Sequence, residues 1–272
     1  MTSHSLNVRG IDVFIEGEGP HAVVMIHGWP DTYHLWDGLT NVLKQQYRCV
    51  RFTLPGFDLA QPARATSLEQ TTELINAIVD AVSPTQPVTL VLHDWGCVFG
   101  YEFAACHPQR VARIVGVDVG DYNSGAYSRS LSVKSKLLAF AYQLWLAVAW
   151  KVGGTLGNRM TRWMARMAGC RAEQSAIGWQ MNYPYAMTWF GLLGGFRGAA
   201  KVAHECPMLY IYGEDKPFMF HSARWTERIS ARPDCAVQSF KTGHWVMTQQ
   251  PEAFSRCVES WLAGCHPPTP KP

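Results

Sequence analysis

The sequence predicts an α/β protein with a mostly parallel, doubly wound sheet and an inserted helical cap. Short runs rich in valine, isoleucine and leucine end at turn residues, as buried parallel strands do. Segments with helical periodicity separate these runs, which is the alternation of a doubly wound sheet. Residues 122–202 interrupt the alternation with a Trp-rich stretch of helical period that contains no such run, and this stretch predicts the cap.

Length and composition predict one globular domain. A chain of 272 residues with 47% apolar and 17% charged residues can bury a full core. We expect the core domain to comprise residues 1–121 and 203–264, with the cap at 122–202 inserted between them. The proline-rich end, "CHPPTPKP" at 265–272, predicts a disordered tail.

The core elements follow from local patterns. "LNVRGIDVFIEGEG" predicts a hairpin at the sheet edge, and "AVVMIH", "YRCVRFTL" and "PVTLVLH" predict three buried parallel strands. Between the second and third strands, Ser67 and Gln70 have capping-box spacing at the start of a predicted helix. The remaining predicted elements are "GCVFGYEFAACHP", "VARIVGVDVGD", "CPMLYIYGED", "SARWTERISA", "CAVQSFKTGH" and "PEAFSRCVESWLAG".

Composition also bounds the function. The net charge of +3 is too small to predict nucleic-acid binding, so we expect a small apolar or amphiphilic partner. Eight cysteines without a C-x-x-C pair, and a start without the apolar core of a signal peptide, predict reduced thiols and a cytoplasmic location. Without a phosphate loop, dinucleotide fingerprint or metal-ligand cluster, we expect no cofactor and no metal.

The stretch "TLVLHDWGC" places Asp94 where a buried strand turns into a helix. Ligands of open parallel sheets collect at the carboxyl ends of the strands. Gly96 and Gly100 supply the small residues that let a helix leave such a turn steeply. An isolated aspartate in this position more often caps the following helix, so Asp94 alone does not establish a site.

Two other segments favour a catalytic role for Asp94. In "MIHGWPD", the turn after His27 can direct backbone N–H groups toward the same crevice, although His27 itself can be structural. In "FKTGHWV", His244 follows Gly243 in a loop after the last predicted strand and before a helix predicted to start near Pro251, whereas a core histidine would more often lie within the strand.

These three segments, HGWP, HDWG and GHW, together resemble the α/β-hydrolase superfamily, in particular its epoxide hydrolase and haloalkane dehalogenase branches. The resemblance covers most of the chain outside the cap. It implies Asp94 as nucleophile, His244 as base, and the N–H groups of Trp29 and Trp95 as oxyanion hole. No G-x-S-x-G occurs, which disfavours a serine esterase. Attack by aspartate on an alkyl carbon leaves an ester that water can cleave, whereas serine would leave an ether.

The acid that orients His244 has two candidates. In such families it usually stands three residues after the glycine of "IYG", but here that position is Lys216 and Asp215 comes one residue earlier. A shift of one residue in extended chain turns the side chain to the other side. Asp118 resembles the acid position of one dehalogenase branch. We favour Asp118 over Asp215, with Asp121 also nearby.

The cap is expected to select the substrate. The resemblance implies two cap tyrosines that hydrogen-bond an epoxide oxygen, and Tyr183 and Tyr185 are the candidates, with Tyr127 and Tyr142 earlier in the cap. We include His27 among the substrate-binding candidates.

The HGWPD turn, with Trp36 further on, resembles epoxide hydrolases more than dehalogenases, and this resemblance implies epoxide opening as the reaction. The alternatives are a haloalkane dehalogenase, with Trp95 and either Trp29 or a cap tryptophan as halide donors, and a non-catalytic binding protein on the same fold.

The cap is strongly basic. Residues 122–171 contain no Asp or Glu but eight Lys and Arg: Arg129, Lys134, Lys136, Lys151, Arg159, Arg162, Arg166 and Arg171. "NRMTRWMARMAG" predicts a basic amphipathic helix, and weak contact with an anionic membrane surface is one interpretation. The interpretation we favour is a helix whose apolar side faces the substrate. The sequence does not predict the oligomeric state.

Overall fold

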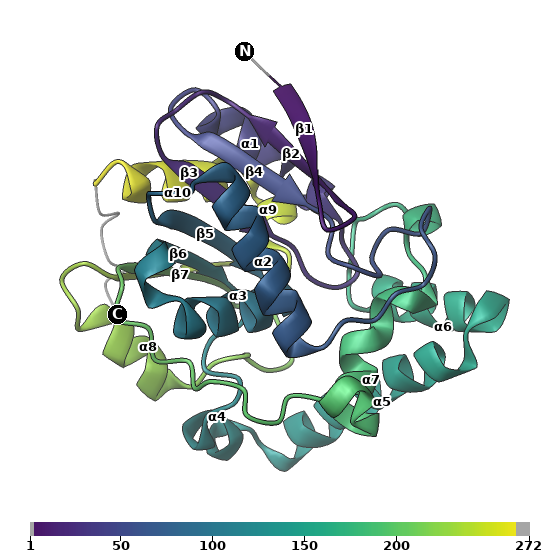
Figure 1. Cartoon of the computed structure of the whole chain (residues 1–272). Helices are drawn as coiled ribbons and strands as arrows, with labels where there is room; N and C mark the ends of the chain where they lie inside the picture. Colours follow the sequence, from purple (N-terminus) through teal and green to yellow (C-terminus); the bar gives the residue numbers. More distant parts are fainter. Residues whose placement is uncertain (1–2, 265–272) are drawn as a thin grey trace.

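The computed structural model describes residues 3–264, so the tail predicted at 265–272 lies outside the described residues. Eight strands form one sheet in the order β1-β2-β4-β3-β5-β6-β7-β8 (Figure 1). β1 pairs antiparallel with β2, and β2 with β4, while every other pairing is parallel. The strands are β1 (Ser3–Val8), β2 (Ile11–Glu16), β3 (Ala22–Ile26), β4 (Arg48–Phe52), β5 (Val88–His93), β6 (Val111–Val117), β7 (Met208–Gly213) and β8 (Ala236–Phe240).

Helices cover both faces of the sheet. Alternate strand residues point to opposite faces, so Val24 and Ile26 of β3 pack into one core cluster and Val23 and Met25 into another. The first cluster contains residues of α2 (Leu68–Val82), α3 (Trp95–Cys106) and α8 (Ala223–Ser230). The second contains residues of α1 (Asp37–Leu43), α9 (Val246–Gln249) and α10 (Pro251–Leu262).

The segment between β6 and β7 is helical, as predicted. It holds α4 (Gly125–Ser130), α5 (Val133–Val152), α6 (Gly154–Met167) and α7 (Tyr183–Phe190), and no strand lies within residues 122–202. α5 packs against both α6 and α7, beside the main sheet (Figure 1). The limits of the cap at 122 and 202 stay a prediction. No helix within residues 3–264 is long and apolar enough to cross a membrane.

Several local predictions are confirmed. The hairpin forms as β1 and β2, and the capping box of α2 is complete, with Ser67 and Gln70 each bonding the backbone of the other. The seven cysteines within residues 3–264 are all free thiols. The sequence analysis missed α1, whose segment "DGLTNVL" is short and begins directly after a 3₁₀ turn.

The turn between β5 and α3 depends on Gly96. A Cβ atom at this position would lie 2.2 Å from the backbone oxygen of Ile26, so α3 can approach the end of β3 only because Gly96 has no side chain. Gly38 in α1 is different, since a Cβ there would meet no atom within 4 Å.

We expect Gly96→Ala to lower the free energy of unfolding by about 1–3 kcal/mol, because the clash is with rigid backbone. The matched variant Gly38→Ala should raise it by up to about 1 kcal/mol, through better helix propensity. Chemical denaturation measures both. Equal effects of the two substitutions would contradict this account of the turn.

Candidate active site

Asp94 lies at a strained turn at the end of β5. Its backbone has φ 52° and ψ −120°, a conformation that is costly for a residue with a Cβ and that is found mostly at functional sites. Its side chain makes no capping hydrogen bond to α3. The alternative that Asp94 serves as a helix cap is therefore wrong, and its carboxylate is available in the crevice.

Backbone N–H groups hold one oxygen of this carboxylate. The N–H of Trp29 donates to Oδ2 of Asp94 at 2.7 Å, and the N–H of Trp95 also stabilises the charged form. Gly28 permits this approach, because a Cβ atom on it would lie 2.5 Å from Oδ2 and 2.6 Å from the nitrogen of Trp95. The structure thus brings together both predicted halves of an oxyanion hole.

His244 stands between two carboxylates. Its Nε2 atom lies 3.6 Å from Oδ1 of Asp94, and its Nδ1 atom makes a short contact with Oδ2 of Asp118. Burial favours the neutral imidazole, but the charge of Asp118, together with hydrogen bonds to Asp118 and Asp94, outweighs burial and raises the pKa of His244 to about 9. The two carboxylates therefore favour the imidazolium form of His244.

Asp118 is shared between His244 and Lys216. Its Oδ1 atom accepts a hydrogen bond from the N–H of Gly213 at 3.0 Å and contacts the ammonium of Lys216, while Oδ2 faces His244. The Asp118 side chain is fully buried and that of Lys216 is 5% exposed. Burial opposes ionisation of Asp118, but Lys216 and His244 outweigh it and keep the pKa of Asp118 well below its usual range.

The other acid candidates lie elsewhere. Asp215 is exposed, and its backbone N–H donates to the carbonyl of Thr242 at 2.9 Å. The alternative that Asp215 orients His244 is therefore contradicted, because Lys216 is the residue of this loop that turns inward. Asp121 accepts hydrogen bonds from the backbone N–H of Ser222 and the hydroxyl of Ser124, which fixes the chain at the start of the cap.

His27 is structural, which corrects its inclusion among substrate-binding residues. Its ring is fully buried, Nε2 accepts from the N–H of Leu54 at 2.9 Å, and Nδ1–H donates to the carbonyl of Gly28 at 2.9 Å. Burial lowers the pKa of His27 to about 4, so the ring stays neutral and both nitrogens are used within the turn.

The two predicted tyrosines have different surroundings. The ring of Tyr185 contacts those of Trp29 and Trp95, with centroids 5.9 and 5.1 Å away, and the charge of Asp94 adds to the burial that raises the pKa of its phenol. The hydroxyl of Tyr183 instead lies 3.2 Å from that of Thr66, away from the nucleophile. The prediction for Tyr183 is thus contradicted by its position.

Tyr142 of α5 is the second tyrosine near the site. Its ring centroid is 6.2 Å from that of Tyr185, and Asp94 is among the charges that act on its phenol. Its hydroxyl accepts a hydrogen bond from the side chain of Gln143 at 3.1 Å, which leaves its own hydrogen to donate. The sequence predicted Tyr142 only as a further cap tyrosine beside Tyr127, because the spacing of the residues did not show which of the two phenols faces Asp94.

The two indoles at the site also differ. Trp29 donates its indole N–H to Oδ1 of Asn182 at 2.7 Å, and Asn182 donates in turn to Thr161 of α6. The indole N–H of Trp95 is buried and makes no hydrogen bond of good geometry with the described residues. The indole of Trp95 instead acts on the hydroxyl of Tyr185, so these two groups face the same region, whereas the indole of Trp29 is bonded to Asn182 of the cap.

His93 was not identified from the sequence. Its ring lies beside that of His244, tilted by 42° at a centroid distance of 4.5 Å, and its Nε2–H donates to the backbone carbonyl of His244 at 3.1 Å. Burial lowers the pKa of His93 to about 3, and the neighbouring His244 adds to this shift. A neutral His93 therefore fixes the loop of the base without adding a charge.

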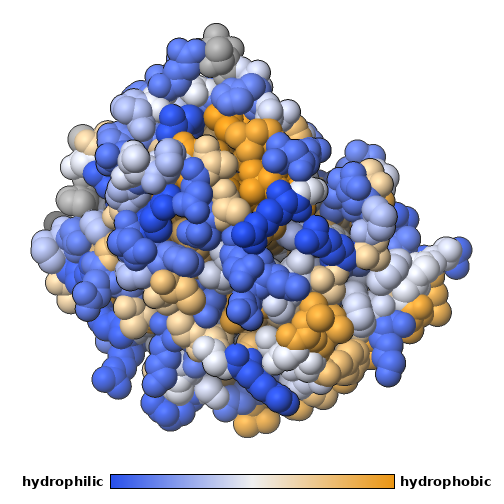
Figure 2. All heavy atoms as spheres, in the orientation of Figure 1, coloured by the Kyte–Doolittle hydropathy of each residue, from blue (hydrophilic) through white to orange (hydrophobic). Residues whose placement is uncertain are grey.

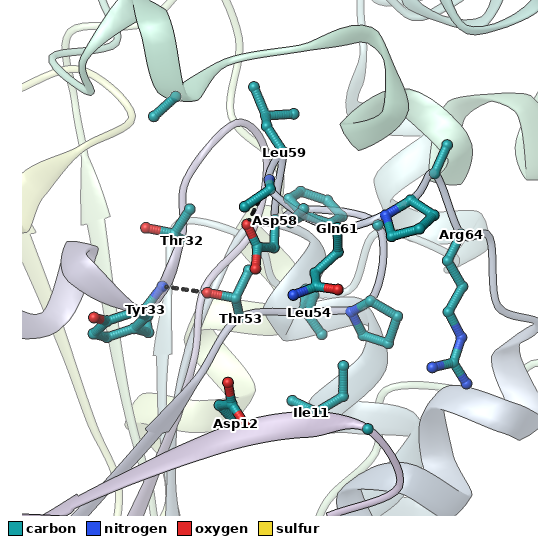
Figure 3. A pocket seen from close by; sticks show the side chains of 18 of the residues that line it. Ile11, Asp12, Thr32, Tyr33, Thr53, Leu54, Asp58, Leu59, Gln61 and Arg64 are labelled. Carbon is teal, nitrogen blue, oxygen red and sulfur yellow. Dashed lines mark hydrogen bonds between the residues drawn. The ribbon is translucent and has the colours of Figure 1, made fainter. Parts of the chain in front are cut away.

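A separate cavity of about 540 Å³ lies next to this region. It opens between Ile11 and Asp12 of β2, the turn at Thr32 and Tyr33, and the segment 53–64 that follows β4 (Figure 3). Neither Asp94, Asp118 nor His244 lines it. This cavity is therefore not the proposed reaction site, because Asp94, His244 and Asp118 meet one another outside its lining.

A family model described as "Alpha/beta hydrolase family" matches residues 23–256. The chain belongs to the alpha/beta hydrolase family. This match and the eight-stranded, mostly parallel sheet confirm the predicted superfamily and fold.

Among curated relatives of this chain, epoxide hydrolase 2 of Caenorhabditis elegans is 21% identical over 94% of this chain and 79% of its own. A cis-3-alkyl-4-alkyloxetan-2-one decarboxylase of Xanthomonas campestris is 33% identical over 127 residues, 42% of each chain. The Probable oxidoreductase EphD of Mycobacterium tuberculosis is 35% identical over 98 residues, or 34% of this chain. The matched part spans only 16% of EphD.

Solved structures of similar fold include enzymes of two activities. An epoxide hydrolase of Bacillus megaterium in complex with an inhibitor has a TM-score of 0.68 at 18% identity, covering 96% of this chain and 100% of its own. A loop variant of the haloalkane dehalogenase DbeA from Bradyrhizobium elkanii has a TM-score of 0.66 at 18% identity, covering 97% of each chain. At this identity the likeness establishes the fold.

We expect Asp118→Asn to lower the pKa of the His244 imidazole by about 1 unit or more, because the charge that most strongly favours its protonated form is lost. Asp215→Asn, the matched change in the exposed loop, should leave that pKa unaltered. An NMR titration of the imidazole protons measures both. A larger shift from the Asp215 variant would contradict the geometry.

Lys216→Met should act in the opposite direction. Without the ammonium, the full charge of Asp118 acts on His244, so we expect the imidazole pKa to rise by about 1 unit. Lys201→Met removes an equal charge from an exposed site and serves as the control in the same titration. If Lys216→Met lowers the His244 pKa or leaves it unchanged, Lys216 does not offset the charge of Asp118.

Proposed function

We propose that this α/β-hydrolase opens epoxides through a covalent ester on Asp94, without a cofactor. One observation supports this most strongly: the Asp94 carboxylate is held at Oδ2 by the N–H of Trp29, while Oδ1 faces His244 at 3.6 Å. One oxygen is thereby fixed as the future carbonyl of an ester, and the other is the nucleophile.

The first step forms the ester. Oδ1 of Asp94 attacks a ring carbon of the epoxide, the carbon–oxygen bond of the ring breaks, and the released alkoxide takes a proton from the hydroxyl of Tyr185. The raised pKa of Tyr185 keeps its proton in place until the alkoxide develops. The rings of Trp95 and Tyr142 have their centroids 5.1 and 6.2 Å from that of Tyr185, so the indole N–H and the second phenol are the groups that would help hold the same oxygen.

The second step cleaves the ester with water. Esterification removes the negative charge of Asp94, which is one of the causes that raise the pKa of His244. The imidazolium therefore loses its proton more readily at this stage, and this proton restores Tyr185. Neutral His244 then deprotonates a water molecule that attacks the ester carbonyl, while the N–H groups of Trp29 and Trp95 hold the oxyanion at Oδ2. The intermediate then collapses: the bond between the ester carbon and the substrate oxygen breaks, the departing alkoxide takes the proton of the hydroxyl that water added, and the diol leaves Asp94 as a carboxylate.

The comparisons support the substrate class at the level of the family. Epoxide hydrolase 2 of C. elegans and an epoxide hydrolase of B. megaterium match almost the whole chain. We infer a small apolar epoxide, because the groups above Asp94 are the rings of Trp29, Trp95 and Tyr185.

A second candidate substrate is an oxetan-2-one. The observation that favours it is the decarboxylase of X. campestris, which is 33% identical over 127 residues. Like an epoxide, an oxetan-2-one is a strained ring with a carbon–oxygen bond that a carboxylate can open. A haloalkane is less favoured, because the indole of Trp29 is bonded to Asn182, so that of the two indoles beside Asp94 only that of Trp95 can bind a halide.

We expect His244→Gln to accumulate the Asp94 ester, since the base of the second step is missing while the nucleophile remains. Intact mass spectrometry after separate incubations with aryl and alkyl epoxides, haloalkanes and an oxetan-2-one measures the adduct. An epoxide adds its entire mass, and a haloalkane adds only its alkyl group.

The double variant Asp94→Ala/His244→Gln is the control and should form no adduct. Peptide mapping should locate the ester at Asp94. An adduct formed equally by the double variant, or no adduct with any compound, would overturn the proposed mechanism.

We expect Tyr185→Phe to lower kcat/KM for an epoxide by about 100-fold, because the proton donor to the alkoxide is lost. Tyr183→Phe removes an identical hydroxyl two residues away, on the side of Thr66, and should change kcat/KM by less than about threefold. Steady-state kinetics of the two variants gives the comparison. Equal losses would show that Tyr185 has no special role.

A further inference from the structure

The cap carries all the exposed large hydrophobic side chains of the described chain. Within residues 3–264, each such side chain lies between residues 133 and 193. A patch of this kind on a folded protein marks an interaction site. The residues are Val133, Leu137, Leu138, Phe140, Trp145, Val148, Val152, Leu156, Trp163, Met167, Trp189, Phe190 and Leu193.

Helix α5 presents an apolar stripe to solvent along its whole length. Val133, Leu137, Trp145, Val148 and Val152 follow one another at helical spacing and are all exposed. The opposite side of the helix carries the buried Leu146, Ala147 and Ala149. A helix of 20 residues is about 30 Å long. An exposed helix that is apolar on both sides is unusual in a globular protein, because one side should be polar.

The stripe continues onto the neighbouring helices. The rings of Trp145 in α5 and Trp163 in α6 lie 5.1 Å apart, and those of Phe140 in α5 and Trp189 in α7 lie 4.9 Å apart. On the face drawn in Figure 2, several hydrophobic residues lie at the lower right, over these helices, with polar residues among them. We call the exposed residues of α5, α6 and α7 the outer cap surface.

Positive charge surrounds this apolar surface. Lys134, Lys136 and Lys151 of α5 are exposed, as are Arg159 and Arg166 of α6, and the ammonium of Lys151 lies 5.7 Å from the ring centroid of Phe190. Glu173 is the sole acidic residue in the sequence from 122 to 202, and its carboxylate accepts a hydrogen bond from Ser175. The cap therefore contains almost no negative charge to balance its cations.

We propose that the outer cap surface docks on a lipid bilayer with anionic headgroups. Apolar side chains with tryptophans at helical spacing, rimmed by lysine and arginine, fit the boundary between acyl chains and negatively charged headgroups. A second copy of the chain fits less well, because two surfaces of equal positive charge would face each other. This inference does not depend on the proposed reaction.

The docked orientation also places the site near the membrane. Tyr142 lies on the inner side of α5, and its ring centroid is 6.2 Å from that of Tyr185. An apolar compound dissolved in the bilayer would then reach the cap from the side on which it is most concentrated.

Sedimentation with vesicles tests the proposal on the full chain. Vesicles of phosphatidylcholine alone are compared with vesicles that also contain phosphatidylglycerol, each at about 50 mM and about 500 mM NaCl. We expect binding to the anionic vesicles at low salt, with a partition coefficient at least about tenfold above that for neutral vesicles, and release at high salt.

Two cap variants separate charge from apolar contact. Lys134→Gln/Lys136→Gln/Lys151→Gln should lower the partition coefficient about tenfold or more through lost attraction to the headgroups. Leu137→Gln/Leu156→Gln should weaken binding through lost insertion. The control Arg224→Gln/Lys241→Gln/Arg256→Gln removes equal charge from exposed core residues and should bind like the unmodified protein. Thermal unfolding checks that each variant is folded.

The proposal is overturned if the protein does not sediment with anionic vesicles at low salt, or if the core variant loses as much binding as the cap charge variant. It is also overturned if sedimentation velocity shows a dimer that only Leu137→Gln/Leu156→Gln abolishes, while vesicle binding is unchanged in that variant. In that case a second copy covers the surface.

Discussion

Four side chains of alternating charge form a row at the carboxyl edge of the sheet: Asp94, His244, Asp118 and Lys216. Burying a charge is costly unless a partner of opposite sign compensates it, and removing one partner leaves the other buried without compensation. Because the row contains two negative and two positive groups, it can be buried as a whole. The pKa of His244 therefore depends on the whole row, and in the proposed mechanism the loss of the Asp94 charge in the ester would lower it.

The row is assembled by backbone geometry that only particular residues allow. Asp94 and Asp118 both have positive φ, at 52° and 69°, which for residues with a Cβ must be stabilised by surrounding contacts. Gly28 and Gly96 let the turn after β3 and the start of α3 approach Asp94 closely. Two strained aspartates and two close-packed glycines thus lie within one small region.

Much of the fold and part of the site could be predicted from the sequence. The strands and helices could be predicted from the hydrophobic period. The turns that contain Trp29, Asp94 and His244 could be predicted because each comes directly after an apolar strand segment. From the sequence, Lys216 was a lysine at a position where the resemblance implies an acid. Its ion pair with Asp118 could not be predicted, because the two residues are 98 positions apart in the chain. Tyr142 and Tyr183 could not be distinguished, because the packing of cap helices on the core determines which hydroxyl faces Asp94. His27 was misassigned because its partner Leu54 comes from a different strand end.

The central claim is that Asp94 itself supplies an oxygen atom to the product. It is tested most directly by a single turnover in H₂¹⁸O, with enzyme in excess over an epoxide that the protein opens. The account predicts that the first diol carries no ¹⁸O, while the peptide that contains Asp94 gains one ¹⁸O atom from the water that cleaves the ester. A first-turnover diol labelled with ¹⁸O and an unlabelled Asp94 peptide would contradict the account, because water would then have attacked the epoxide directly.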